Sequence, residues 1–127
     1  MKAIAGDLVF LAPARETRAI IEWRARLPDV GAFFGFRLAW NTRGMFWTLD
    51  CTTSAGSPLW YGVAVRTDVA LNLPFRGPDF PPGLIWCEDV EGLARDPVRT
   101  GFRTVNRLNY RPEGVVASVA GTADELT

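Results

Sequence analysis

Residues 34–53 read FGFRLAWNTRGMFWTLDCTT, and this stretch decides the fold. On both sides of the turn-forming residues 41–44, apolar side chains occupy every second position, which is the period of a half-buried strand. Asparagine, threonine and glycine between the two runs supply the chemistry of a tight turn. The stretch therefore predicts a β-hairpin, with Trp40 on the core face of its first strand and Trp47 on the core face of its second.

The same period of two continues on both sides of this hairpin. Residues 17–27 carry apolar side chains at odd positions and charged ones at most even positions, with Ile20 as the exception. A helix is the alternative for this stretch, because it would also align several of the apolar residues. After the turn residues 54–58, residues 59–66 alternate again. The hairpin and residues 59–66 predict three consecutive antiparallel strands, which form a meander, and residues 17–27 predict a separate strand before it.

The chain changes character after residue 71. Four prolines and two glycines fall within residues 72–83, and proline lacks the N–H that a central strand must donate, so we expect a long loop held by Phe75 and Phe80. Further along the chain the pattern predicts a short strand at 84–87, a loop at 88–99 and a last strand at 102–110, with no convincing helix.

Together these elements predict an all-β fold. We expect a small antiparallel sandwich or a partly open barrel, with a long proline-rich loop and a C-terminal arm. Residues 1–111 are expected to form a single β domain whose N-terminal strand is a possible arm. Residues 112–127 are small and polar, which is typical of a terminal tail or arm.

Composition and charge exclude several classes of protein. The 127 residues include 14 basic and 14 acidic side chains and no histidine. A balanced charge gives no long-range attraction to nucleic acid, so we expect no nucleic-acid specificity. Without histidine, the commonest general base and the commonest zinc ligand are missing. We therefore expect a protein that is not an enzyme and that needs no metal or cofactor.

The two cysteines and the N-terminus point to a protein made in a cytoplasm. Cys51 and Cys87 are expected to be buried reduced thiols, and a single disulfide is the alternative. The apolar run at the N-terminus is short and interrupted by Asp7, so it predicts neither a signal peptide nor a membrane span.

The aromatic side chains are the candidates for an interaction site. Five tryptophans and eight phenylalanines exceed the usual needs of a small core. Trp60 is out of phase with the apolar residues on either side of it, so we expect it to point away from their face. It could then anchor a protein interface, pack under a loop or stack on a ligand. Phe75, Phe80 and Arg111 are the other candidate interface residues.

An acidic group, Glu88, Asp89, Glu91 and Asp96, is the other polar cluster. Its spacing lacks the alternating ligand pattern of a helix–loop–helix calcium site, so a solvated loop is favoured over calcium binding. Catalysis by a pair of carboxylates has no further support in the sequence.

The order of short motifs along residues 34–110 carries a resemblance. FRLAWN at 36–41 and FWTLD at 46–50 are followed by Gly-Ser-Pro-Leu at 56–59, Pro-Pro-Gly-Leu at 81–84 and Asn-Tyr at 109–110. This succession resembles the small baseplate plug family of contractile-tailed phages and prophages. The motifs are structural and specify a layout of strands. None of them is a catalytic signature.

The resemblance implies a non-enzymatic structural component of the virion, located in the tail baseplate. Its expected partners are other baseplate, hub and tube proteins, with several copies in each tail and synthesis in the bacterial host cytoplasm. A compact β domain with free strand edges suits burial in a symmetric assembly. The alternative is a small β domain that binds a carbohydrate or another ligand through exposed aromatic side chains.

Overall fold

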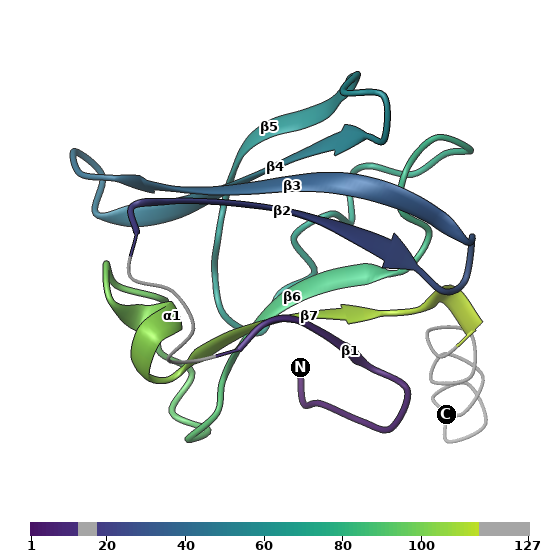
Figure 1. The fold of residues 1–127 in the computed structure, drawn as a ribbon. Helices are drawn as coiled ribbons and strands as arrows, with labels where there is room; N and C mark the ends of the chain where they lie inside the picture. Colours follow the sequence, from purple (N-terminus) through teal and green to yellow (C-terminus); the bar gives the residue numbers. More distant parts are fainter. Residues whose placement is uncertain (13–17, 115–127) are drawn as a thin grey trace.

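The computed structural model describes residues 1–12 and 18–114, which form a sandwich of two antiparallel sheets (Figure 1). The larger sheet has the strand order β2-β3-β4-β5 and the smaller one has the order β1-β7-β6. The two sheets do not close into a barrel, so the all-β prediction is confirmed in its sandwich form. The strands are β1 (Leu8–Leu11), β2 (Ile20–Leu27), β3 (Ala32–Asn41), β4 (Phe46–Thr53), β5 (Pro58–Ala64), β6 (Leu84–Asp89) and β7 (Asn106–Arg111).

The larger sheet contains the predicted three-strand meander as β3, β4 and β5, and β2, which is a strand rather than a helix, adds a fourth strand to it. Its four strands pair in chain order through three hairpins. At the β3–β4 turn the Met45 N–H donates to the Asn41 carbonyl over 2.8 Å, and the Gly44 N–H donates to the Asn41 side chain over 2.9 Å. The asparagine side chain thus closes the turn in the way that its position in the sequence predicts.

The core lies between the two sheets. Every second residue of β4 and of the central part of β3 is buried, which is the alternation on which the strand prediction rests. Trp47 is buried, and Trp40 packs against the same cluster, so both tryptophans lie on the core side as predicted. The smaller sheet contributes fully buried side chains from β6 and β7, namely Ile85, Cys87, Leu108 and Tyr110.

The proline-rich segment 72–83 is a loop, as predicted, and its base is closed by one side chain. The Asn72 amide is fully buried, donates to the Gly83 carbonyl over 3.0 Å and accepts from the Ile85 N–H over 2.8 Å. Phe75 and Phe80 pack against the core from within the loop. The prediction that these two rings hold the loop is confirmed.

The start of the predicted last strand is wrong. Residues 101–104 form one turn of helix, α1 (Gly101–Thr104), and β7 begins only at Asn106. A side chain at position 101 would place its Cβ 2.6 Å from the Asn106 side-chain oxygen, so the glycine allows this close approach. The helical turn directs Phe102 into the core, where its ring packs edge-on against Trp47 at 5.6 Å.

The N-terminal strand, expected as a possible arm, is part of the smaller sheet in this structure. β1 pairs with β7, with Leu8 opposite Tyr110. The preceding residues 1–7 lie against the outer face of the same sheet (Figure 1), where the Lys2 carbonyl accepts a hydrogen bond from Arg111. Of the predicted C-terminal arm, residues 112–127, the part from residue 115 onward lies outside the described residues.

Candidate interaction surface

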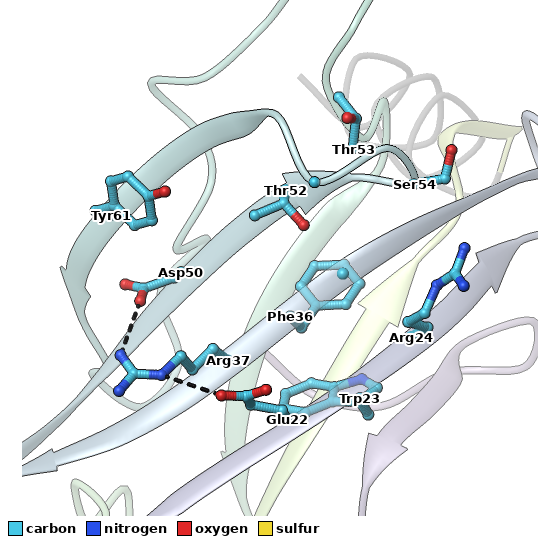
Figure 2. Close-up of a pocket in the computed structure, with 12 residues that line it drawn as sticks. Glu22, Trp23, Arg24, Phe36, Arg37, Asp50, Thr52, Thr53, Ser54 and Tyr61 are labelled. Atoms are coloured by element: carbon cyan, nitrogen blue, oxygen red, sulfur yellow. Dashed lines mark hydrogen bonds and ion pairs between the residues drawn. The ribbon is translucent and has the colours of Figure 1, made fainter.

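The outer face of the larger sheet carries a ladder of charges (Figure 2). Arg37 of β3 lies between its two register partners, Glu22 of β2 and Asp50 of β4. The Arg37 Nε is 3.5 Å from a Glu22 carboxylate oxygen, and Nη1 is 3.4 Å from Asp50 Oδ2. The other Asp50 oxygen accepts a hydrogen bond of 2.7 Å from the Gly62 backbone N–H in β5. One polar network therefore spans all four strands.

A hollow of about 550 Å³ lies beside this ladder, on the same face. Gly35 contributes no side chain to it, and a Cβ at this position would lie 2.5 Å from the Thr52 hydroxyl. Two cations, two carboxylates, the hydroxyl side chains at and after the end of β4, and Tyr61 surround the hollow (Figure 2). The missing side chain at Gly35 leaves the recess open, and the polar side chains form its rim.

The residue types around this hollow are common at protein–protein interfaces. The Tyr61 side chain is 67% exposed, and the guanidinium of Arg24 stands 5.6 Å from the centroid of the exposed Phe33 ring. Tyrosine, arginine and phenylalanine are enriched where proteins meet. The two carboxylates, Glu22 and Asp50, are both engaged by Arg37. The face therefore suits a partner that offers polar groups and an aromatic or aliphatic side chain.

Sequence reasoning did not find this face. One signal was available, because an isolated glycine within a strand pattern often marks a bulge or a close approach of another group. Gly35 sits between two phenylalanines in such a pattern. The ladder itself depends on the cross-strand register, which places Arg37 opposite Asp50, and this register is not encoded within either strand alone.

Trp60 lies in the core, so the prediction that its side chain points outward is wrong. Its side chain is 5% exposed and stacks on Phe75 at 5.1 Å, with Phe80 6.4 Å beyond Phe75. The pairing of β4 with β5 shifts register on either side of Cys51, which faces Trp60. These shifts bring Trp60 to the core side and leave Tyr61 exposed. Of the three roles considered for Trp60, the structure shows packing under a loop.

Arg111, another candidate interface residue, binds the N-terminal segment of its own chain. Its Nε is 3.0 Å from one carboxylate oxygen of Asp7, its Nη2 donates to the other over 3.1 Å, and Nη2 also donates to the Lys2 carbonyl over 2.7 Å. The guanidinium lies 5.4 Å from the Trp86 ring centroid. Trp60, Phe75, Phe80 and Arg111 are thus all engaged within the chain, and their role in an interface stays a prediction.

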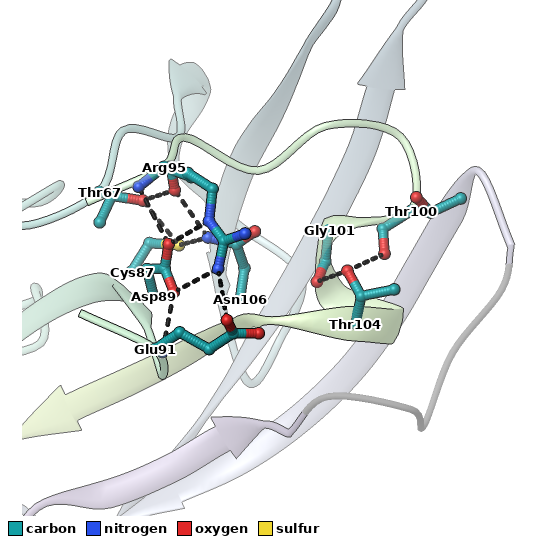
Figure 3. A network of polar contacts seen from close by, with 9 residues as sticks. All are labelled: Thr67, Cys87, Asp89, Glu91, Arg95, Thr100, Gly101, Thr104 and Asn106. Atoms are coloured by element: carbon teal, nitrogen blue, oxygen red, sulfur yellow. Dashed lines mark hydrogen bonds and ion pairs between the residues drawn. The ribbon is translucent and has the colours of Figure 1, made fainter. Parts of the chain in front are cut away.

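The acidic loop is tied to the body of the protein by its own side chains (Figure 3). Asp89 is buried at the end of β6 and accepts from Arg95 Nε over 2.6 Å and from Arg95 Nη2 over 3.1 Å. The hydrogen bond from Arg95 is the main reason that the pKa of Asp89 is held well below its ordinary value. The Arg95 carbonyl in turn accepts from Thr67 and Asn106, over 2.6 and 2.9 Å.

This network shows that acidic side chains of the group stabilise the loop. Asp96 accepts the Thr67 backbone N–H over 2.8 Å, so two of the four acidic residues anchor the loop. In the described residues, no group of three or more acidic, cysteine or histidine side chains is placed to hold a metal ion. The loop prediction for residues 90–99 is confirmed, and the strand before it runs two residues further than predicted, to Asp89.

Cys51 and Cys87 are both free and buried. Burial raises the pKa of each thiol to about 12, so neither is a nucleophile at neutral pH. Their burial agrees with the prediction of core thiols.

A comparison with protein-family models matches residues 29–113 to the family described as Cyanophage baseplate Pam3 plug gp18. The chain belongs to this family. The match runs from the β2–β3 turn to just beyond β7, so it includes three of the four strands beneath the hollow. The resemblance to phage baseplate plugs is confirmed, over a longer stretch than the motifs alone indicated.

Family membership makes the protein a structural component of a phage baseplate, in the virion tail and in contact with other baseplate components. The comparison with curated proteins found no match. Within residues 1–12 and 18–114, the structure has no helix that is both long and apolar enough to cross a membrane.

Proposed function

We propose that the protein is a plug-like subunit of the hub and tube region, without enzymatic activity, that packs in several copies against other tail proteins. Family membership supports a place in the baseplate. The outer face of the larger sheet supports the mode of action, because it combines a hollow with an exposed tyrosine and arginine. A subunit of this kind acts through the surface area that it buries.

The contrast between the two outer faces is the observation that carries this proposal. Residues 1–7 lie over the outer face of the smaller sheet through Arg111 and through Glu88, whose carboxylate accepts the Ala3 N–H over 3.3 Å. Among the described residues, no segment lies in this way over the hollow of the larger sheet. That hollow is therefore the recess that a neighbouring subunit can fill.

The alternative function, carbohydrate or ligand binding, required an outward-facing tryptophan, and Trp60 does not face outward. Trp60 is buried beneath Phe75, so it offers no face to a sugar ring. Synthesis in the host cytoplasm stays a prediction, and two free thiols are consistent with it.

The experiment fills the hollow without changing any charge. Thr52→Trp places an indole over Gly35, its register partner, where an aromatic ring covers a glycine favourably in a sheet. Thr48→Trp is the matched control, because it makes the same change on the same strand and face, outside the residues that line the hollow. Both variants should remain folded, which circular dichroism and thermal unfolding check.

Tails are then purified from cells that supply either variant, and the copies of this protein per tail are counted by quantitative mass spectrometry. We expect Thr52→Trp to lower incorporation by about tenfold or more, as for the loss of a central contact at a protein interface. Thr48→Trp should incorporate like the natural protein. Normal incorporation of a folded Thr52→Trp variant would refute packing through the hollow.

A further inference from the structure

The edges of the two sheets differ in how they are protected from pairing with another chain. The outer edge of β6 is covered by bridges to Thr67 and Ala70. The edge strand β5 begins with Pro58 and pairs irregularly with β4, and β1 has only four residues. Prolines, bulges, short strands and covering segments are the usual protections of an edge.

Among the described residues, the edge strand β2 has none of these four protections, and its charged side chains are its only safeguard against pairing with a wrong partner. It is eight residues long, contains no proline, and pairs with β3 in an unbroken register from Ile20 to Leu27. In the sheet order of the described residues it is an end strand, so one side of its backbone has no strand beside it. Such an edge is a template for a further strand.

The hydrogen-bond phase shows which residues of β2 face this open side. The Trp40 N–H donates to the Ala19 carbonyl over 2.8 Å, and the β2–β3 register continues from this pair. Residues of an antiparallel pair alternate between bonded and non-bonded positions, so the odd residues of β2 bond to β3. The even residues Ile20, Glu22, Arg24 and Arg26 therefore direct their N–H and C=O groups toward the open edge.

We propose that a second copy of this chain adds to this edge, with β2 antiparallel to β2 across a twofold axis. An added strand must pair even residues with even residues, which leaves a few possible registers. Centring the pair on Glu22 sets two carboxylates opposite each other, and centring it on Arg24 sets two guanidinium groups opposite each other. Centring it on Trp23 pairs Glu22 with Arg24 of the partner subunit, twice by symmetry.

The core side of β2 also suits this register. Trp23 is half-buried at the open edge, stacked on Phe36 at 5.5 Å and edge-on to Phe10 at 6.2 Å. In this register Trp23 lies beside the twofold axis, and the exposed part of its ring contacts Trp23 of the partner subunit. Ile21 is then set opposite Ala25 of the partner subunit, so the inner face stays apolar from one copy to the next.

Charge exchange between Glu22 and Arg24 tests the register on the full chain. Glu22→Arg alone sets arginine against arginine, and Arg24→Glu alone sets glutamate against glutamate. We expect each to raise the dimer dissociation constant, measured by sedimentation equilibrium, by about tenfold, because each creates two like-charge contacts. An equimolar mixture of the two variants restores both opposite-charge contacts, so heterodimers should form with nearly the natural affinity.

Arg43→Glu is the matched control, because it makes the same charge change in the β3–β4 turn, away from the edge. It should leave the dissociation constant unchanged. A natural protein that stays monomeric at millimolar concentration overturns the proposal. So does a dimer that both single variants leave intact, or a mixture that binds no better than either variant. The pairing uses Glu22, Trp23 and Arg24, which also line the hollow, but it does not rest on the proposed function, which a monomeric result leaves in place.

Discussion

Replacing Tyr110 with phenylalanine removes a single hydroxyl that joins three parts of the fold. The ring is fully buried and stacks on Phe10 at 5.5 Å, a contact that the variant keeps. The hydroxyl donates to Asp29 Oδ2 over 2.8 Å and accepts from the Gly83 N–H over 2.8 Å. It thus connects β7 to the β2–β3 turn and to the end of the proline-rich loop.

The size of the effect follows from these two bonds. A hydrogen bond to a charged acceptor contributes about 1.5–3 kcal/mol, and a buried donor left without a partner costs about 1–3 kcal/mol. Asp29 keeps a second donor, the Glu113 N–H at 2.8 Å, which reduces the first loss. We expect Tyr110→Phe to lower the free energy of unfolding by about 2–4 kcal/mol. Burial raises the pKa of Tyr110 far above its ordinary value, so the hydroxyl stays a donor throughout the assay.

Urea unfolding followed by tryptophan fluorescence measures this loss as a lower midpoint at an unchanged slope. Tyr61→Phe is the control, because the Tyr61 side chain is 67% exposed and its hydroxyl leaves the stability within about 0.5 kcal/mol. If Tyr110→Phe also stays within about 0.5 kcal/mol of the natural protein, the hydroxyl does not stabilise the connection of β7 to the β2–β3 turn and the proline-rich loop as described.

Two further predictions concern ionisable groups. The Arg95 guanidinium lowers the pKa of Asp89 in the folded protein, so the unfolded chain binds a proton at this carboxylate more readily. The stability that the ionised carboxylate provides is therefore lost as the pH falls below about 4. Asp89→Asn should therefore be less stable than the natural protein at neutral pH, by a margin that shrinks in acid. A margin that is constant in urea unfolding from neutral to acid pH would contradict this. Burial raises the pKa of Cys51 and Cys87 to about 12. A thiol-reactive dye should therefore label both cysteines far more slowly in the native protein than in guanidinium. Equally rapid labelling in the two conditions would show that the thiols are accessible in the native protein.

The strands of the meander could be predicted because their signal is local. Alternation of apolar and polar residues is a property of each strand by itself, and a single asparagine reports the turn at residue 41. The same holds for the proline-rich loop, since a proline lacks a backbone donor in any context. These features follow from the residues themselves.

The parts that escaped prediction depend on contacts between distant segments. Trp60 turns inward because β4 and β5 pair with two shifts of register, and no pattern within residues 58–64 shows those shifts. The helical turn Gly101–Thr104 is possible because Gly101 fits closely against Asn106. The hollow at Gly35 requires knowing that Thr52 lies opposite it. Each of these features depends on how two segments contact each other, so neither segment alone predicts it.

The pairing of Leu8 with Tyr110 has a consequence for synthesis on the ribosome. The four strands of the larger sheet emerge in order and can pair as they appear, whereas β1 has to wait for β7, which comes near the end of the chain. Until then the apolar side of the meander has no second layer to cover it. A nascent chain stalled before residue 106 would expose that side to chaperones, so completing translation is what completes the core.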